Sequence, residues 1–347
     1  MKAFPLWIAI ASCLLLSGCQ PRDAASEQVA CQPDFVPVKD KMGQMVLDLK
    51  LAGGALLLQQ DGKRLCEEYI GAFDEDTVVP VVSAAKWLSA ATILALVDEG
   101  ALSLDDPVSK YLPYFQGAHG AITLRQLLSH TSGLPDYSNC MFVPQLTLDR
   151  CAREIAQATL IAPPGTQFNY GGTAFTVAGR MAEVAGRANW HALFASRMAE
   201  PLGLLSISYS NTTNPILSEG YVTSSLRDYG IFLQMILNGG MYGGRRVLTE
   251  QAIEEMLKDQ TASADVHFSP RGPDLRYGLG VWRDRVNEDG TLSQASSPGG
   301  GGFVPWIDFD RKLIGVFMVQ DRIERVWDTV VEVVRGTRDI IDQRANR

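Results

Sequence analysis

The spacing of apolar positions changes along this chain, and each change marks an expected element. Residues 39–51 place four apolar side chains on one face at helical spacing, which predicts an amphipathic helix. Two apolar runs, 54–60 and 64–70, then flank the pair Asp61-Gly62. An Asp-Gly pair between two apolar runs predicts two strands joined by a tight hairpin turn.

The middle of the chain favours helices. A helix is expected from Ser83 to about Glu99, ended by Gly100. The region 102–227 has the pattern of helices and loops, with one helix capped by Thr123 and another over 173–185 that ends at Gly186.

Strand patterns return late, in apolar runs at 277–282, 302–307 and 313–319, and a final helix is expected over 323–341. The terminal segments therefore predict a sheet flanked by helices. A helical region is inserted between them in the sequence.

Composition narrows the class of protein. The chain has 347 residues, of which 46% are hydrophobic and 20% charged, and its formal net charge is -8. These values are typical of a globular protein with one large domain or two. A mildly acidic chain without runs of Lys and Arg argues against nucleic-acid binding.

The N-terminus has the pattern of an export signal. Lys2 precedes the apolar run 4–16, which is short for a permanent membrane anchor, and Leu16-Ser17-Gly18-Cys19 follows. This pattern resembles a bacterial lipoprotein signal, and a plain secretory signal is the alternative. The resemblance implies a signal peptide at 1–18, a lipidated tether at 19–36 that begins at Cys19, and a domain at 37–347. It also implies a membrane anchor, in the outer membrane and facing the periplasm.

Export makes disulfides possible for the four cysteines after Cys19. Four cysteines allow three pairings. We favour Cys140–Cys151, which closes a short loop, and Cys31–Cys66, which ties the tether to the sheet. No Cys/His cluster has the spacing of zinc ligands, and no metal or cofactor is expected.

The chemistry begins with Ser83-Ala84-Ala85-Lys86. A serine and a lysine three positions apart lie on one helix face, where the amine can reach the hydroxyl. A serine hydroxyl becomes a useful nucleophile when a neighbouring base takes its proton. The spacing therefore proposes a nucleophile and its base, and the alternative is an ordinary helix start with Ser83 as N-cap.

Further motifs follow in order along the chain: Leu104-Asp105-Asp106-Pro107-Val108, Leu127-Leu128-Ser129-His130-Thr131-Ser132-Gly133-Leu134-Pro135, Phe168-Asn169-Tyr170-Gly171-Gly172, Tyr277-Gly278-Leu279-Gly280 and the glycine run near Gly299. With these motifs the chain resembles the serine β-lactamase-like hydrolases from about residue 40 to 340. It is most similar to the branch of class C β-lactamases, esterases and D-alanyl-D-alanine peptidases. The resemblance implies an α/β (α+β) fold of the β-lactamase/transpeptidase type, an antiparallel sheet flanked by helices with a helical subdomain over about 102–227.

The resemblance also implies catalytic roles. Ser83 would form the acyl-enzyme, Lys86 would accept or relay its proton, and Tyr170 would act as base and as proton donor to the leaving group. The backbone amide of Ser83, at a helix start, would be one oxyanion donor. Gly300 would supply the second, with a register uncertain by one residue along the four glycines.

Two departures from the family pattern concern the substrate. Gly172 stands where the family has an asparagine that holds a substrate amide, and Ser297-Pro298 stands where it has Lys-Thr, which helps to bind a substrate carboxylate. Loss of a polar clamp and of a cation weakens recognition of an anionic amide. This favours ester substrates, with β-lactam or peptidoglycan amides as the alternative. A lipoprotein that binds a cell-wall ligand without catalysis is the third interpretation.

The remaining conspicuous side chains are expected to be structural. His130 is expected to have a structural hydrogen-bonding role, and the other three histidines to be ordinary surface or core residues. Trp282 or Trp306 could line the cleft. The absence of Gly-x-Ser-x-Gly argues against a hydrolase with a Ser-His-Asp triad on the α/β-hydrolase fold.

Overall fold

A computed structural model describes residues 30–347 except 211–216 and 218–221. The expected signal peptide and the lipidation site Cys19 lie outside the described residues. Residues 31–36, which the sequence assigned to the tether, pack on the domain. Phe35 is fully buried, and the amide of Gln32 donates to the carbonyl of Leu65 at 2.9 Å. No helix in the described ranges is long and apolar enough to cross a membrane.

A seven-stranded antiparallel sheet forms the centre of the fold, in the order β2-β1-β13-β12-β11-β10-β9. Its strands are β1 (Gly53–Gln60), β2 (Lys63–Gly71), β9 (Arg276–Tyr277), β10 (Trp282–Val286), β11 (Leu292–Ser296), β12 (Phe303–Asp308) and β13 (Leu313–Val319). The predicted hairpin at Asp61-Gly62 is confirmed. Both turn residues have positive φ, +47° and +74°, as a two-residue turn that matches the strand twist requires.

Helices cover both faces of this sheet. On one face, α1 (Val36–Asp48) and α11 (Ile323–Ala345) pack together against alternate residues such as Leu56 and Phe317. On the other face, α2 (Ala85–Asp98) and α9 (Leu226–Leu237) share a core with Val316 and its neighbours. Because both faces are covered, β12 and β13 are buried at every position. This explains why they appear in the sequence as continuous apolar runs.

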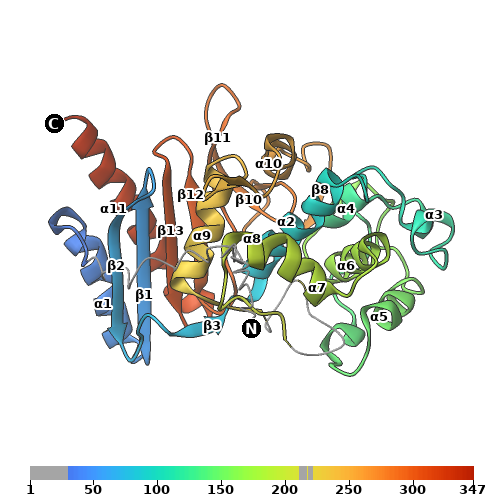
Figure 1. The fold of residues 1–347 in the computed structure, drawn as a ribbon, viewed down its shortest axis with the longest axis horizontal. Helices are drawn as coiled ribbons and strands as arrows, with labels where there is room; N and C mark the ends of the chain where they lie inside the picture. Colours follow the sequence, from blue (N-terminus) through green and yellow to red (C-terminus); the bar gives the residue numbers. More distant parts are fainter. Residues whose placement is uncertain (1–29, 211–216, 218–221) are drawn as a thin grey trace, which may run out of the picture.

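The inserted region is helical, as predicted, and Figure 1 shows it in green beside the sheet. Its helices are α3 (Gly117–Gly120), α4 (Leu124–Leu128), α5 (Leu148–Ile155), α6 (Thr173–Gly186), α7 (Trp190–Phe194) and α8 (Glu200–Leu202); α10 (Glu250–Leu257) follows α9. Thr123 caps α4 as expected, accepting from the amide of Gln126. Gly186 is the last residue of α6, and Arg187 takes the left-handed conformation with φ of +51°.

Two short strand pairs join the inserted region to the rest of the chain. They are β3 (Val78–Pro80) with β5 (Thr223–Ser225), and β4 (Gln167–Asn169) parallel to β8 (Asp265–Phe268). A third pair, β6 (Met241–Tyr242) with β7 (Arg245–Arg246), is a local hairpin. The helix α2 lies between the sheet and the green helices (Figure 1), and twelve of its residues are buried. An all-round apolar helix of this kind is a core element.

One strand prediction was wrong. The apolar run 277–282 is a hairpin, in which Tyr277 of β9 pairs with Trp282 of β10. The residues between them form a buried turn. Gly278 packs on the backbone of Met256, and Gly280, with φ of +77°, packs on the backbone of Lys86. The turn is apolar because it packs on two helices, so its hydrophobicity did not indicate a strand.

Candidate active site

Ser83 lies at the point where a short strand passes into the central helix. After β3, residues Val82–Ala84 form a 3-10 turn that continues directly into α2. Val82 has φ of +50°, a conformation that is strained for a β-branched residue and that is found at functional sites. Ser83 is half-buried and makes no capping hydrogen bond, so the N-cap interpretation is wrong. Its backbone amide lies in a first helical turn, where amides have no intrahelical acceptor.

Lys86 is one turn further along and points back to the serine. Its side chain is fully buried, and its Nζ lies 3.2 Å from Ser83 Oγ in a hydrogen bond. This hydrogen bond holds the amine beside the hydroxyl. The pair that the sequence spacing proposed is therefore assembled in the fold.

Tyr170 joins this pair from the inserted region. Lys86 Nζ lies 4.6 Å from the centre of the Tyr170 ring, over its face. The other side of the site is aromatic, because Trp282 stacks on Tyr170 with ring centres 5.2 Å apart. Trp282 therefore lies at the site, as the sequence allowed, whereas Trp306 packs in the core with α1 and α11.

The turn that contains His130 holds Tyr170 in position through its backbone. The amide of Asn169 donates to the carbonyl of His130 at 2.9 Å, and the amide of Tyr170 donates to the carbonyl of Phe268 at 3.1 Å. Gly133, with φ of +75°, lets the turn pack closely on the backbone of Ala162. This motif therefore supports β4, the strand that ends directly before Tyr170.

The imidazole of His130 does not have the role that the sequence predicted. Both ring nitrogens are buried, and neither has a hydrogen-bond partner among the described residues. The ring packs 4.6 Å from Tyr170 and 5.0 Å from Tyr277, measured between ring centres. Burial, with the nearby Lys86, holds the pKa of His130 well below its ordinary value of 6.5. His130 is thus a neutral packing group behind the Lys86–Tyr170 contact.

The glycine run forms the opposite edge of the site. The amides of Ser297 and Gly299 donate to β12, at the carbonyls of Pro305 and Phe303. Gly300 follows in a tight turn, which the amide of Gly302 closes on the carbonyl of Gly299 at 3.0 Å, and its role as an oxyanion donor stays a prediction. Side chains at Gly299 and Gly301 would meet Val81 and Val82, so the run lies against the residues that precede Ser83. Ser297 Oγ also donates to the carbonyl of Ser83 at 3.4 Å.

Gly172 is the residue before α6, directly after Tyr170-Gly171. Its amide donates to the carbonyl of Asp136 at 2.8 Å. Gly172 thus lies beside the site, with its backbone amide already hydrogen-bonded to Asp136. As a glycine, it has no side-chain amide to offer a ligand.

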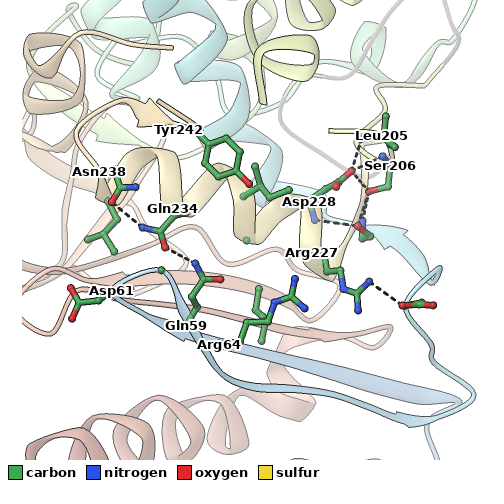
Figure 2. Close-up of a pocket in the computed structure, with 18 of the residues that line it drawn as sticks. Gln59, Asp61, Arg64, Leu205, Ser206, Arg227, Asp228, Gln234, Asn238 and Tyr242 are labelled. Carbon is green, nitrogen blue, oxygen red and sulfur yellow. Dashed lines mark hydrogen bonds and ion pairs between the residues drawn. The ribbon is translucent and has the colours of Figure 1, made fainter. Parts of the chain in front are cut away.

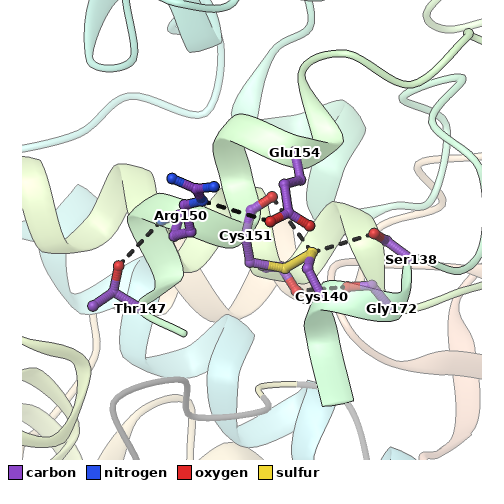
Figure 3. Close-up of a disulfide and its surroundings, with 8 residues drawn as sticks. Ser138, Cys140, Thr147, Arg150, Cys151, Glu154 and Gly172 are labelled. Carbon is purple, nitrogen blue, oxygen red and sulfur yellow. Dashed lines mark hydrogen bonds and ion pairs between the residues drawn. A yellow bond between two sulfur atoms is a disulfide. The ribbon is translucent and has the colours of Figure 1, made fainter. Parts of the chain in front are cut away.

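Both predicted disulfides are confirmed, Cys31–Cys66 and Cys140–Cys151. The first joins the start of the domain to β2. The second joins the loop after the His130 turn to α5, and Figure 3 shows it with Gly172 close to Cys140.

Sequence reasoning missed one support of the nucleophile. The hydroxyl of Tyr229, fully buried in α9, donates to the carbonyl of Ala84 at 2.8 Å across a separation of 145 residues. No local pattern links two residues so far apart in the chain, so only the fold reveals this contact.

A separate cavity of about 1380 Å³ lies between α9 and the β1–β2 hairpin, and none of the three predicted catalytic residues lines it. The side-chain amides that line this cavity hydrogen-bond to one another (Figure 2). Gln59 Nε2 donates to Gln234 Oε1 at 2.7 Å, and Gln234 Nε2 donates to Asn238 Oδ1 at 2.9 Å. Arg227 likewise pairs with Glu75 at 2.9 Å. The three predicted catalytic residues therefore lie outside this cavity.

Comparisons with known proteins agree with this geometry. The chain is 29% identical over 188 residues to esterase EstB of Burkholderia gladioli, covering 46% of this chain and 48% of EstB. It is 26% identical over 283 residues to the D-alanyl-D-alanine-carboxypeptidase/endopeptidase AmpH of Escherichia coli K12, covering 71% of each. Other alignments cover less of the relative: 36% of the length of protein flp of Staphylococcus aureus N315, and 48% of EstB.

A solved structure extends the likeness over most of the fold. The crystal structure of a candidate beta-lactamase from Bacteroides dorei DSM 17855 matches with a TM-score of 0.76 and 35% identity, over 87% of this chain and 99% of that one. The sequence model of the Beta-lactamase family matches residues 38–327. The chain belongs to the Beta-lactamase family.

Proposed function

We propose that this protein is a serine hydrolase that cleaves neutral esters through an acyl-enzyme on Ser83. One observation carries the proposal: the buried amine of Lys86 lies 3.2 Å from Ser83 Oγ and 4.6 Å from the Tyr170 ring centre. A hydroxyl with a positioned base beside it is the arrangement that nucleophilic catalysis requires.

The steps follow from these positions. Ser83 Oγ attacks the ester carbonyl, and its proton passes to the Lys86–Tyr170 pair. The oxyanion is held by the backbone amides of Ser83 and Gly300. When the C–O bond breaks, the pair returns the proton to the leaving alcohol. Water then attacks the acyl-enzyme and gives a proton to the same pair. The pair returns this proton to Ser83 Oγ as the bond between Oγ and the acyl carbon breaks, which releases the acid and restores the serine.

Two features support esters over β-lactams. Gly172 offers no side-chain amide to a substrate, and Ser297-Pro298, which follow β11, stand where the family has Lys-Thr. The similarity to EstB supports the same choice. The similarity to AmpH, which covers 71% of both chains, favours an amide-cleaving peptidase as the second candidate.

Active-site labelling tests the proposal directly. A fluorophosphonate probe should label the wild type, and Ser83→Ala should abolish the label while the exposed control Ser103→Ala retains it. Lys86→Ala and Tyr170→Phe should each lower the labelling rate by about 10² or more. A correctly folded wild type that takes no label would contradict both enzyme candidates and leave the non-catalytic binding protein.

Substrate ranking separates the two enzyme candidates. Short p-nitrophenyl esters should have a higher kcat/KM than a chromogenic cephalosporin or a D-alanyl-D-alanine peptide. The reverse order would establish the amide-cleaving candidate.

We further propose that the chain is anchored in the outer membrane through a lipid on Cys19. The motif Leu16-Ser17-Gly18-Cys19 supports this proposal. Cys19→Ala should move the protein from the membrane fraction to the soluble fraction of the envelope. Unchanged fractionation would contradict the anchor.

A further inference from the structure

The loop that carries Cys140 is fixed at both ends beside the site. At its start, the carbonyl of Pro135 accepts from Thr173 Oγ1, and the carbonyl of Asp136 accepts from the amide of Gly172. At its other end, the disulfide joins Cys140 to Cys151, which is fully buried in α5. Because α5 packs on α6, the disulfide ties this loop to the helix that begins just after Gly172.

The loop also packs directly on the residues that follow Tyr170. A side chain at Gly171 would collide with the backbone of Asp136, so the two backbones are in contact there. Figure 3 places Gly172 close to Cys140, at the disulfide. The loop therefore lies against the two residues that follow Tyr170.

Its surface toward solvent is aromatic. Tyr137 is 55% exposed and Phe142 is 37% exposed. Their rings stack, with centres 5.4 Å apart and planes 27° apart. The hydroxyl of Tyr137 donates to Asn139 Oδ1 at 2.8 Å, which fixes the direction of that ring. Exposed aromatic rings held in a fixed geometry are typical of binding surfaces, because their apolar area is ordered before the ligand arrives.

We propose that the stacked pair Tyr137–Phe142 is an apolar subsite that binds the hydrocarbon substituent of a neutral ester substrate. The inference rests on the proposed esterase function. Tyr137 directly follows Asp136, whose carbonyl accepts from the amide of Gly172, and Gly172 has no side chain to recognise a polar group. The substrate class is therefore an ester with an extended alkyl or aryl group.

The selectivity ratio tests this subsite. We define it as kcat/KM for the octanoate ester of p-nitrophenol divided by kcat/KM for the acetate ester. A second ratio is measured in the same way on acetate esters in which the alcohol group, and not the acyl group, is lengthened. Burial of methylenes on the pair should raise kcat/KM by about two- to fourfold for each of the first few methylenes. The double variant Tyr137→Ser/Phe142→Ser should lower the ratio by about tenfold or more in one of the two series.

Two further variants make the result specific. The single variant Tyr137→Phe keeps the aromatic ring, so its selectivity ratio should equal that of the wild type. Leu47→Ala removes a side chain that is 71% exposed on α1, on the far face of the sheet, and should leave the ratio unchanged. Thermal melting checks that the double variant is folded, and the single variant Tyr137→Ser, at the more exposed of the two positions, takes its place if it is not.

The outcomes separate the two proposals. A wild type that hydrolyses no ester contradicts the esterase function. A wild type that hydrolyses esters with the same ratio in the double variant, in both series, overturns the subsite alone. A lower ratio in Leu47→Ala as well would show that the effect is not local and would also overturn it.

Discussion

Replacement of Gly280 by alanine tests whether the Tyr-Gly-Leu-Gly motif acts by holding the helix that carries Lys86. Gly280 has φ of +77°, and a Cβ there would lie 2.6 Å from the carbonyl oxygen of Lys86 and 2.7 Å from Cβ of Ala90. Gly62 provides a matched control. Its φ is +74°, and nothing lies within 4 Å of a Cβ added to it.

The two substitutions share one cost and differ in the other. A left-handed conformation costs an alanine about 1–2 kcal/mol at either position, and the smaller entropy of the unfolded alanine chain offsets part of this equally in both. Only Gly280→Ala adds the cost of overpacking, about 1–3 kcal/mol. The free energy of unfolding should therefore fall by about 1–3 kcal/mol more in Gly280→Ala than in Gly62→Ala.

Chemical denaturation and labelling measure the two consequences. Urea titrations of both variants give the difference in the free energy of unfolding. The fluorophosphonate labelling rate of Ser83 should also fall in Gly280→Ala, by about 10² if the turn of Lys86 moves by 1 Å, and should stay at the wild-type level in Gly62→Ala. Equal destabilisation by the two variants, with equal labelling rates, would refute the packing role of this motif.

Two other expectations follow from the fold. Removing the Cys31–Cys66 disulfide, which spans 35 residues, should lower the free energy of unfolding by about 4 kcal/mol. Removing Cys140–Cys151, which spans 11 residues, should lower it by about 3 kcal/mol. Urea titration of the two Cys→Ser double variants measures both losses, and a larger loss for the shorter loop would contradict this expectation. The pKa of His130 is held well below 6.5, so below that pH the unfolded chain binds a proton that the folded chain does not. The free energy of unfolding should then fall with decreasing pH by up to about 1.4 kcal/mol per unit, and parallel pH profiles of wild type and His130→Asn would disprove this contribution.

Much of the fold could be predicted because local patterns and tertiary packing agree there. The hairpin at Asp61-Gly62 needs positive φ, and its residues favour that turn in any context. The final helix and the strands β12 and β13 are long, periodic or wholly apolar segments. Both disulfides followed from spacing and from the expected place of the N-terminal segment beside the sheet.

The failures share a physical cause, which is long-range packing. The run 277–282 is apolar because its turn packs on α2 and α10. A buried turn therefore has the same apolar pattern as a buried strand. His130 is polar in the sequence, yet the structure uses its backbone carbonyl and leaves both ring nitrogens without hydrogen-bond partners among the described residues. The strained Val82 before the nucleophile had no local signal, since valine rarely takes φ of +50°.

The site itself could be found from the sequence because its supporting motifs require glycine for steric reasons. Gly133, Gly171, Gly280 and Gly299 all lie where a side chain would collide with another backbone. Each contact fixes the position of Ser83, Lys86 or Tyr170 relative to the rest. Tyr137, which we propose to contact the substrate, carries no such constraint, because it is more than half exposed and many side chains fit there. This difference explains why the motifs point to Ser83, Lys86 and Tyr170, whereas the proposed ester substrate depends on an exposed aromatic pair that no motif marks.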